Sequence, residues 1–234
     1  MSDPNALPAD EGHVFLFDKP LGWTSFQAVK KLKYLSKSKK IGHAGTLDPL
    51  ASGLLVICSG KKTKTIEAIQ AQPKEYEALV RLGASTPSYD LETEPEQFTP
   101  WEHLDREAIE QALHSFRGEI WQTPPLFSAI KVNGKRAYDL ARAGSDHTLK
   151  SRPVQIHELE LLDMQGSDLR LRIRCSKGTY IRSLAHDLGI ALGTRSHLAA
   201  LRRTKIGDFS VEQALSPDQW QREFRPESEE TPSN

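Results

Sequence analysis

Residues 42–53 read GHAGTLDPLASG, the stretch of this chain with the most unusual combination of residues. Glycines and a proline impose a special backbone around three side chains with chemical potential, His43, Thr46 and Asp48. Asp48 stands before a proline, which suits either a turn or the cap of a helix whose first residue is that proline. On these residues alone, a structural role and a chemical role for Asp48 both stay open.

The elements around this loop are predicted from apolar periodicity. A strand is expected at residues 13–17, a helix capped by Thr24 or Ser25 follows it, and a second strand is expected at 53–58. Lysines occupy the polar face of the helix. Its core side is predicted from apolar residues at helical spacing, which include Phe26, Val29 and Leu32.

Downstream, the pattern favours hairpins over helical crossovers. Alternation predicts a strand at 74–82, and hairpins are expected at 128–138 and 154–176. Helices are expected to begin at Asp105 and after residue 179, and the acidic segment 83–100 is expected to be a surface insertion. Interspersed strands and helices of this kind predict an α+β fold with a mixed, mainly antiparallel sheet flanked by helices.

Composition and missing motifs exclude several classes of protein. With 38% hydrophobic and 26% charged residues, the chain reads as an ordinary soluble globular protein, and neither a membrane anchor nor a secretory signal is expected. Cys58 and Cys175 lie alone in apolar runs, so they are interpreted as core thiols in a reducing compartment. Phosphate-binding, dinucleotide-binding and zinc-protease motifs are absent, so no metal or cofactor is expected.

The net charge of zero hides an uneven distribution. Residues 1–65 carry 10 basic and 5 acidic groups and residues 125–210 carry 15 and 8, whereas residues 66–124 carry 4 and 12. If the two basic blocks meet in space, they form a face that attracts a polyanion. Basic side chains spread over solvated helices are the alternative interpretation.

Several motifs together resemble the pseudouridine synthases of the TruB type, which modify the TΨC arm of tRNA. GHAGTLDPLASG resembles the catalytic signature of that family, and VFLFDKPLGWTS at 14–25 resembles its first motif. Order and spacing agree from about residue 12 to residue 212. The other matching segments are KEY (74–76), RLG (81–83), FRG (116–118), PPLFSAIK (124–131), CSKGTYIRSL (175–184) and LRR (201–203).

The resemblance implies a pseudouridine synthase fold with a central active-site cleft, in a catalytic domain at 12–212. Residues 1–11 are expected to be a disordered tail and residues 213–234 a polar, partly disordered extension. Many family members continue into a small C-terminal RNA-binding domain, so this chain resembles a short form without it. The resemblance further implies a cytoplasmic, monomeric enzyme that isomerises uridine 55 of the tRNA TΨC loop without metal, cofactor, membrane or obligate protein partner.

The resemblance also implies catalytic residues. Asp48 matches the family's nucleophile, a role that suits a carboxylate, and Arg182 is expected to pair with it. Tyr76 is expected to stack on a uracil flipped out of the RNA arm and to help remove the C5 proton, although core packing would also explain a tyrosine there.

Further residues are expected to bind the substrate. His43 matches the residue that fills the space left by the flipped base, Tyr180 and Leu201 match the lining of the base pocket, and Lys19 is expected to support the catalytic loop or a phosphate. Tyr180 and Leu201 could instead be simple core residues. The residues expected to contact RNA phosphates are Lys61, Lys62, Lys64, Arg202 and Arg203. The ladder of Arg170, Arg172 and Arg174 could join them or form a solvated sheet face.

Two other functions stay open at this stage. One is a binding module that opens and refolds the tRNA elbow without catalysis, which the presence of Asp48, Tyr76 and Arg182 disfavours. The other is an enzyme guided to a different RNA by partner proteins, which the lack of an extra domain and of basic tails disfavours. Whether Asp48 attacks C1′, attacks the pyrimidine ring or assists an elimination is also undecided.

Overall fold

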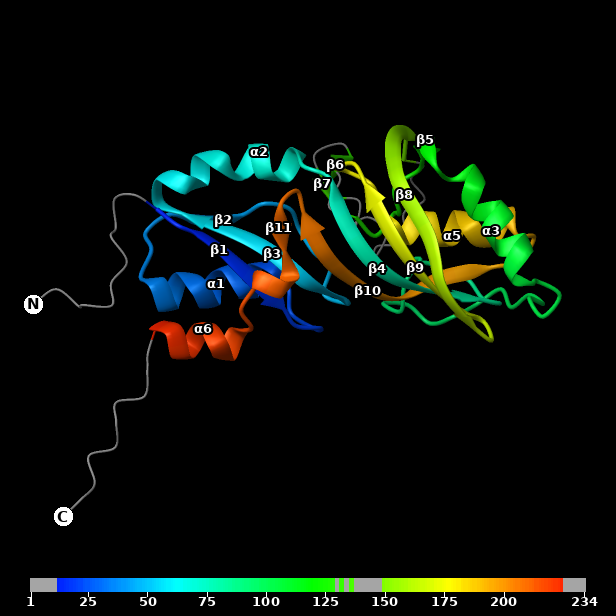
Figure 1. Ribbon diagram of the computed structural model, residues 1–234, viewed down its shortest axis with the longest axis horizontal. Helices are drawn as coiled ribbons and strands as arrows, with labels where there is room; N and C mark the ends of the chain where they lie inside the picture. Colours follow the sequence, from blue (N-terminus) through cyan, green and yellow to red (C-terminus); the bar gives the residue numbers. More distant parts are fainter. Residues whose placement is uncertain (1–11, 129–130, 133–134, 137–148, 225–234) are drawn as a thin grey trace, which may run out of the picture. The chain divides into compact units, whose positions relative to one another are not determined.

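The computed structural model describes residues 12–128, 131–132, 135–136 and 149–224 (Figure 1). The chain forms two compact units, unit 1 with residues up to 74 and from 202 onward, and unit 2 with residues 75–201. The catalytic domain predicted at 12–212 stays a prediction beside this division. The expected tail at 1–11, the hairpin turn Asn133-Gly134 and residues 225–234 lie outside the described residues.

The sheet of unit 1 is built around one buried strand. Strand β3 (Ala51–Ser59) pairs antiparallel with β1 (Val14–Lys19) and with β2 (Ile41–His43), and β10 (Ser196–Ile206) follows β3 in the strand order. The short β11 (Phe209–Ser210) pairs with β10. Because β3 is an interior strand covered on both faces, its apolar run is continuous rather than alternating.

Helices cover both faces of this sheet (Figure 1). On one face, α1 (Ser25–Ser36) and α6 (Pro217–Phe224) pack over a core that includes Phe15, Phe17, Ala28, Leu32, Leu55 and Ile57. On the other, the 3-10 helix η1 (Gly60–Thr65) leads into α2 (Ile66–Ala71), over a core that includes Ala44, Leu54, Val56, Cys58 and Ile69. A further 3-10 turn, η2 (Val211–Gln213), precedes α6.

The predicted core side of α1 is wrong at Phe26. Thr24 caps the helix through a capping box with Gln27, as expected, but the Phe26 side chain is 72% exposed. The Ser25 hydroxyl is instead bonded to the backbone of Leu47, which rotates Phe26 outward. The buried side of α1 therefore comprises Ser25, Ala28, Leu32 and Leu35.

Part of the polar extension predicted at 213–234 is an ordered helix. This helix, α6, packs on β1 and α1. Trp220 and Phe224, one turn apart, place their rings 5.4 Å and 6.2 Å from the ring of Phe15. Two apolar side chains in an otherwise polar segment are enough to dock it.

Unit 2 contains the predicted hairpins. Its strands follow the order β10, β4 (Lys74–Leu82), β9 (Asp168–Cys175), β8 (Arg152–Gln165) and β5 (Gly118–Gln122). The β8–β9 hairpin is antiparallel, and β6 (Lys131–Val132) pairs with β7 (Lys135–Arg136) as a separate hairpin. Helices α3 (Arg106–Ser115), capped by Asp105, and α5 (Ile181–Ala191) bury the predicted apolar stripes. The α+β class is confirmed.

Segment 83–100 is not a simple surface insertion. Ser85, Thr86, Ser88 and Asp90 are buried, and the Tyr89 ring stacks on His186 of α5 with centroids 3.9 Å apart. Its small polar side chains bond to its own backbone, so the segment folds into a compact loop of unit 2.

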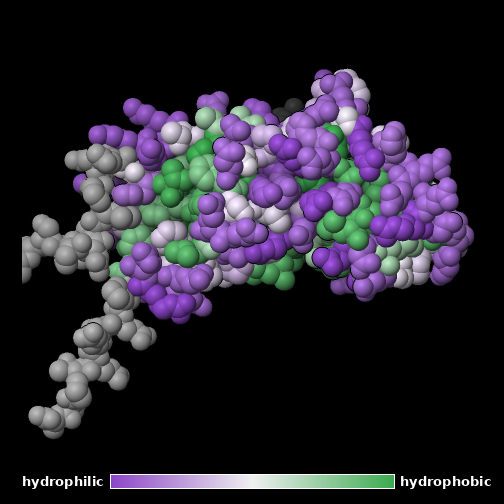
Figure 2. Space-filling view, in the orientation of Figure 1, coloured by the Kyte–Doolittle hydropathy of each residue, from purple (hydrophilic) through white to green (hydrophobic). Residues whose placement is uncertain are grey.

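The surface and the two cysteines agree with the composition. The face shown in Figure 2 is mainly hydrophilic, with its apolar residues in separate patches. Cys58 and Cys175 are buried free thiols, as expected. No helix within the described ranges is long and apolar enough to cross a membrane.

Candidate functional site

The loop that carries Asp48 joins β2 to β3 in unit 1, and hydrogen bonds hold it along its length. The Ser25 hydroxyl donates to the Leu47 carbonyl at 3.0 Å and accepts from the Leu47 N–H at 2.9 Å. The Asp48 carbonyl accepts from Ala51 N–H at 3.0 Å, and the Pro49 carbonyl accepts from Gly22 N–H at 2.8 Å. Residues 48–51 therefore form a reverse turn with Pro49 and Leu50 at its centre, rather than a helix cap, and these bonds restrict the backbone of the loop.

Arg203 lies beneath this loop, and its expected contact with RNA phosphate is wrong. Its side chain is 1% exposed, and its guanidinium donates to the carbonyls of Leu54 at 2.8 Å, Thr46 at 3.3 Å and Gly45 at 3.1 Å. β10 approaches β3 so closely here that a Cβ on Gly53 would lie 2.3 Å from the Arg203 carbonyl oxygen. Arg203 is thus an internal brace of the loop that carries Asp48.

Lys19 is a second buried cation near Asp48. It ends β1, is 0% exposed, and its ammonium donates to the carbonyls of Pro20 at 3.0 Å and Trp23 at 2.6 Å. Burial lowers the pKa of Lys19 to about 8; the Asp48 carboxylate opposes this fall and the Arg203 cation adds to it. The attraction is mutual, so the Lys19 cation stabilises the ionised form of Asp48. This placement fits a support for the loop rather than a phosphate contact.

His43 ends β2 at the start of the same loop and is half-buried. Burial lowers its pKa below the ordinary value for histidine, and the nearby Arg203 cation lowers it further, against a backbone hydrogen bond at Gly45. The imidazole is therefore neutral at pH 7. Unit 1 thus gathers Asp48, Lys19, His43 and Arg203 around one loop.

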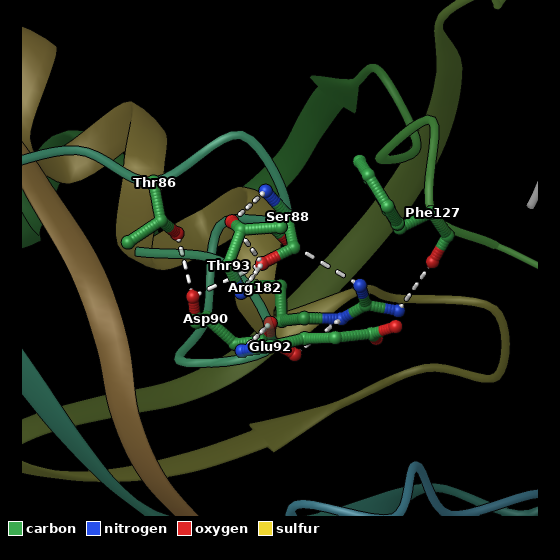
Figure 3. Close-up of polar contacts among 7 residues, drawn as sticks. All are labelled: Thr86, Ser88, Asp90, Glu92, Thr93, Phe127 and Arg182. Carbon is green, nitrogen blue, oxygen red and sulfur yellow. Dashed lines mark hydrogen bonds and ion pairs between the residues drawn. The ribbon is translucent and has the colours of Figure 1, made fainter. Parts of the chain in front are cut away.

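In unit 2, Arg182 lies in the first turn of α5 with its guanidinium buried (Figure 3). It donates to the carbonyls of Ser88 at 3.2 Å and Phe127 at 2.9 Å, and its Nε lies 3.6 Å from a carboxylate oxygen of Asp90. Both partners of this ion pair are more than nine-tenths buried. The predicted pairing of Arg182 with Asp48 joins residues of different units and stays a prediction.

Asp90 is a candidate site residue that the sequence analysis missed. One of its carboxylate oxygens accepts from the Glu92 N–H at 3.0 Å, and its own carbonyl accepts from the hydroxyls of Thr86 at 2.6 Å and Ser88 at 3.0 Å (Figure 3). The carboxylate that meets Arg182 is thereby fixed. The signal was the run STPSYD at 85–90, whose short polar side chains favour backbone hydrogen bonds over solvent.

The other residues predicted to contact the flipped base, which lie in unit 2, differ in burial. Tyr76 is 8% exposed, on the same buried side of β4 as Ala78 and Val80. Tyr180 is half-buried at the start of α5, where its backbone exchanges two hydrogen bonds with Gln122. Leu201 is half-buried on β10. These positions suit a pocket lining and a core equally well.

The cations expected at the surface divide into two groups. Lys61, Lys62 and Lys64 are exposed on η1. Arg202, in contrast, forms a bidentate pair with Asp18 at 3.1 Å and 2.8 Å, which offsets its charge. The arginine ladder of β9 is likewise compensated, because Arg172 pairs with Glu160 and Arg174 with Glu158. Across the described part of the chain, no group of His, Cys, Asp or Glu side chains could hold a metal ion.

Comparison with known proteins identifies the class to which this fold and site belong. Residues 33–181 match the family model described as "TruB family pseudouridylate synthase (N terminal domain)", and residues 182–231 match "tRNA pseudouridylate synthase B C-terminal domain". The fold is therefore that of a pseudouridine synthase, an isomerase. The match continues past residue 212, where the sequence resemblance had ended, and includes α6.

Individual relatives agree over most of the chain. "tRNA pseudouridine synthase B" of Flavobacterium johnsoniae is 55% identical over 88% of this chain and 93% of the relative, and that of Thermobifida fusca is 44% identical over 90% and 75%. A solved "Cbf5-Nop10-Gar1 Complex" superposes with a TM-score of 0.68 at 33% identity, over 87% of this chain and 51% of that one. The chain belongs to the TruB family of pseudouridylate synthases.

Proposed function

We propose that this pseudouridine synthase converts uridine 55 in the TΨC loop of tRNA to pseudouridine, with Asp48 as nucleophile. The name of the relatives supports tRNA as the substrate. The observation that carries the role of Asp48 is that two buried cations, Lys19 and Arg203, lie beside a fixed loop that presents it. Such an arrangement stabilises an ionised carboxylate in a defined position before substrate arrives.

The reaction balances without a cofactor. The N1–C1′ bond of the uridine breaks, a C5–C1′ bond forms, and the proton lost from C5 is matched by one gained at N1. The uracil must first leave its stack in the RNA arm, at a cost of a few kcal/mol. Asp48 then attacks C1′, attacks the ring, or assists an elimination, and each of these routes requires the carboxylate form.

Other residues receive supporting roles in this proposal. Tyr76 stacks on the flipped base and helps remove the C5 proton, Arg182 orients the nucleophile, and His43 fills the space that the base leaves. Tyr180 and Leu201 line the base pocket. A stacked base would gain on the order of 1–3 kcal/mol, which is comparable to the cost of extrusion.

The proposal also covers how the enzyme binds its RNA and where it works in the cell. The exposed Lys61, Lys62 and Lys64 contact phosphates of the T arm, so affinity falls with salt. The enzyme works in the cytoplasm as a monomer without an obligate protein partner; size-exclusion chromatography with light scattering tests the monomer.

The experiment that tests the substrate position is pseudouridine mapping on a tRNA transcript. After incubation with the enzyme and carbodiimide treatment, a reverse-transcription stop is expected one nucleotide to the 3′ side of position 55. This stop is expected to vanish in a transcript with cytidine at position 55. A stop at another uridine would refute the assignment. Tight binding with no stop at all would replace it with the RNA-remodelling function.

A further inference from the structure

Helix α1 carries a row of positive charge on the side turned away from the core. Phe26, Lys30, Lys33 and Lys37 recur at intervals of four, three and four residues, which places them on one face of the helix. All four side chains are exposed, as are Lys39 and Lys40 in the turn that follows. Between Asp18 and Asp48 the sequence contains seven lysines and no acidic residue.

For four of these lysines, the charge is not offset within the described part of the chain. No carboxylate lies within ion-pair distance of Lys30, Lys33, Lys39 or Lys40 there. Like charges three and four residues apart destabilise a helix by a few tenths of a kcal/mol per pair. The repulsion between Lys30 and Lys33 therefore costs α1 stability, and no carboxylate of the described residues offsets it.

The arginine ladder of β9 shows the opposite arrangement. Arg170, Arg172 and Arg174 also form an exposed cationic row, but Arg172 pairs with Glu160 and Arg174 with Glu158 across the hairpin. Two of the three arginines of the β9 row are thus paired within their own hairpin, whereas Lys30 and Lys33 of α1 have no carboxylate partner among the described residues.

The α1 row begins at the catalytic loop. Ser25, which precedes Phe26, is the residue whose hydroxyl clamps the Leu47 backbone next to Asp48. From Phe26 the row rises about 16 Å along the helix to Lys37. At the far end of the row, the turn that follows α1 lies beside the start of η1, because the Gly60 N–H donates to the Lys40 carbonyl at 2.9 Å. The cations thus continue from the nucleophile's loop to Lys61, Lys62 and Lys64.

We propose that this surface, formed by Lys30, Lys33, Lys39 and Lys40 with the exposed ring of Phe26, binds the phosphate backbone of the RNA substrate outward from the reacting nucleotide. An aromatic ring beside evenly spaced lysines suits a nucleic acid, because the ring stacks on a base while the ammonium groups neutralise phosphates. The inference deepens the proposed function and rests on it for the identity of the RNA.

The test compares two triple variants that remove equal charge. One is Lys30→Gln, Lys33→Gln and Lys40→Gln, and its control is Arg170→Gln, Arg172→Gln and Arg174→Gln. Binding of a T-arm stem-loop RNA to the full chain is measured from about 0.05 to 0.3 M KCl. Glutamine keeps a helix propensity close to that of lysine, so α1 is expected to remain folded.

The α1 variant is expected to bind about 10- to 100-fold more weakly near 0.1 M salt, with the slope of log K against log salt reduced in magnitude by about 2 to 3. The control is expected to change the slope by less than about 0.5. At saturating RNA, turnover of the α1 variant should equal that of the wild type, with only KM raised.

Two outcomes would overturn the proposal, and a third would overturn only the proposed function. If the α1 variant binds the RNA as tightly as the wild type, the surface does not bind this RNA and its charge serves another anionic partner. If both variants lose affinity equally, the loss comes from net charge and not from the position of the lysines. Wild-type turnover on the same RNA is measured in parallel. If the wild type binds without turnover while the α1 variant loses affinity, the proposed function fails and the binding surface stands.

Discussion

Replacing the buried Arg203 with methionine tests whether this arginine braces the loop that carries Asp48 from inside, as its hydrogen bonds indicate. The guanidinium makes three hydrogen bonds, to the carbonyls of Gly45, Thr46 and Leu54. Charged hydrogen bonds contribute about 1.5–3 kcal/mol each, and removal of a buried charge returns part of its desolvation cost. We therefore expect Arg203→Met to lower the free energy of unfolding by about 3–5 kcal/mol.

The neighbouring residue supplies a matched control. Arg202 carries the same charge on the same strand, but its pair with Asp18 is partly exposed, so Arg202→Met should cost at most about 1 kcal/mol. Urea unfolding followed by tryptophan fluorescence measures both variants. Equal, small losses of stability, with Arg203→Met weakening RNA binding instead, would refute the brace and restore the phosphate contact.

Three further predictions follow from the same geometry. Asp90→Asn should lower kcat on the order of 100-fold with little change in KM, because a neutral amide leaves the buried Arg182 charge poorly compensated; single-turnover rates near wild type would contradict this. Because the pKa of Lys19 is about 8, its cation is lost as the pH rises through 8, so wild-type turnover should fall above that pH. For Lys19→Met, turnover is expected to be slow and independent of pH over the same range. If the turnover of this variant falls above pH 8 as well, Lys19 is not the group that titrates. Gly53→Ala should destabilise the protein by on the order of 2–4 kcal/mol in thermal unfolding, since φ is +99° and the new Cβ meets the β10 backbone; an unchanged melting temperature would disprove that close approach.

The elements that the sequence predicted best are those set by local alternation. Strand β4 runs from Lys74 to Leu82 as predicted, because its buried and outward residues alternate without interruption. The same holds for the outward arginines of β9 and for α3, whose cap and apolar stripe lie within one segment. The local sequence pattern was sufficient to predict an element where the burial of each side chain follows from its place in the same strand or helix.

The errors arose where the partner lies far away in the sequence. Phe26 was placed in the core because an apolar residue at helical spacing favours burial, but the bond from Ser25 to Leu47 sets the rotation of α1. Arg203 looks like a surface cation until the carbonyls of Gly45 and Leu54 are beside it. Such long-range hydrogen bonds leave no periodic trace in the sequence.

Site residues divide along the same line. The glycines and proline around Asp48 left its role open, and the interpretation of Asp48 as a nucleophile rested on the resemblance of several motifs to one family. Asp90 was missed because its buried ion pair is with Arg182, about ninety residues away in the sequence. Asp90 itself lies in an acidic segment that was expected to be exposed to solvent.

The most direct test of the whole account is tritium release from a T-arm RNA that carries [5-³H]uridine, with the wild type beside Asp48→Asn. The account predicts release by the wild type and none above background by the variant, while both bind the RNA with similar affinity. Release by Asp48→Asn at the wild-type rate would contradict the role of Asp48 as nucleophile. If neither protein releases tritium although both bind, the catalytic account is wrong.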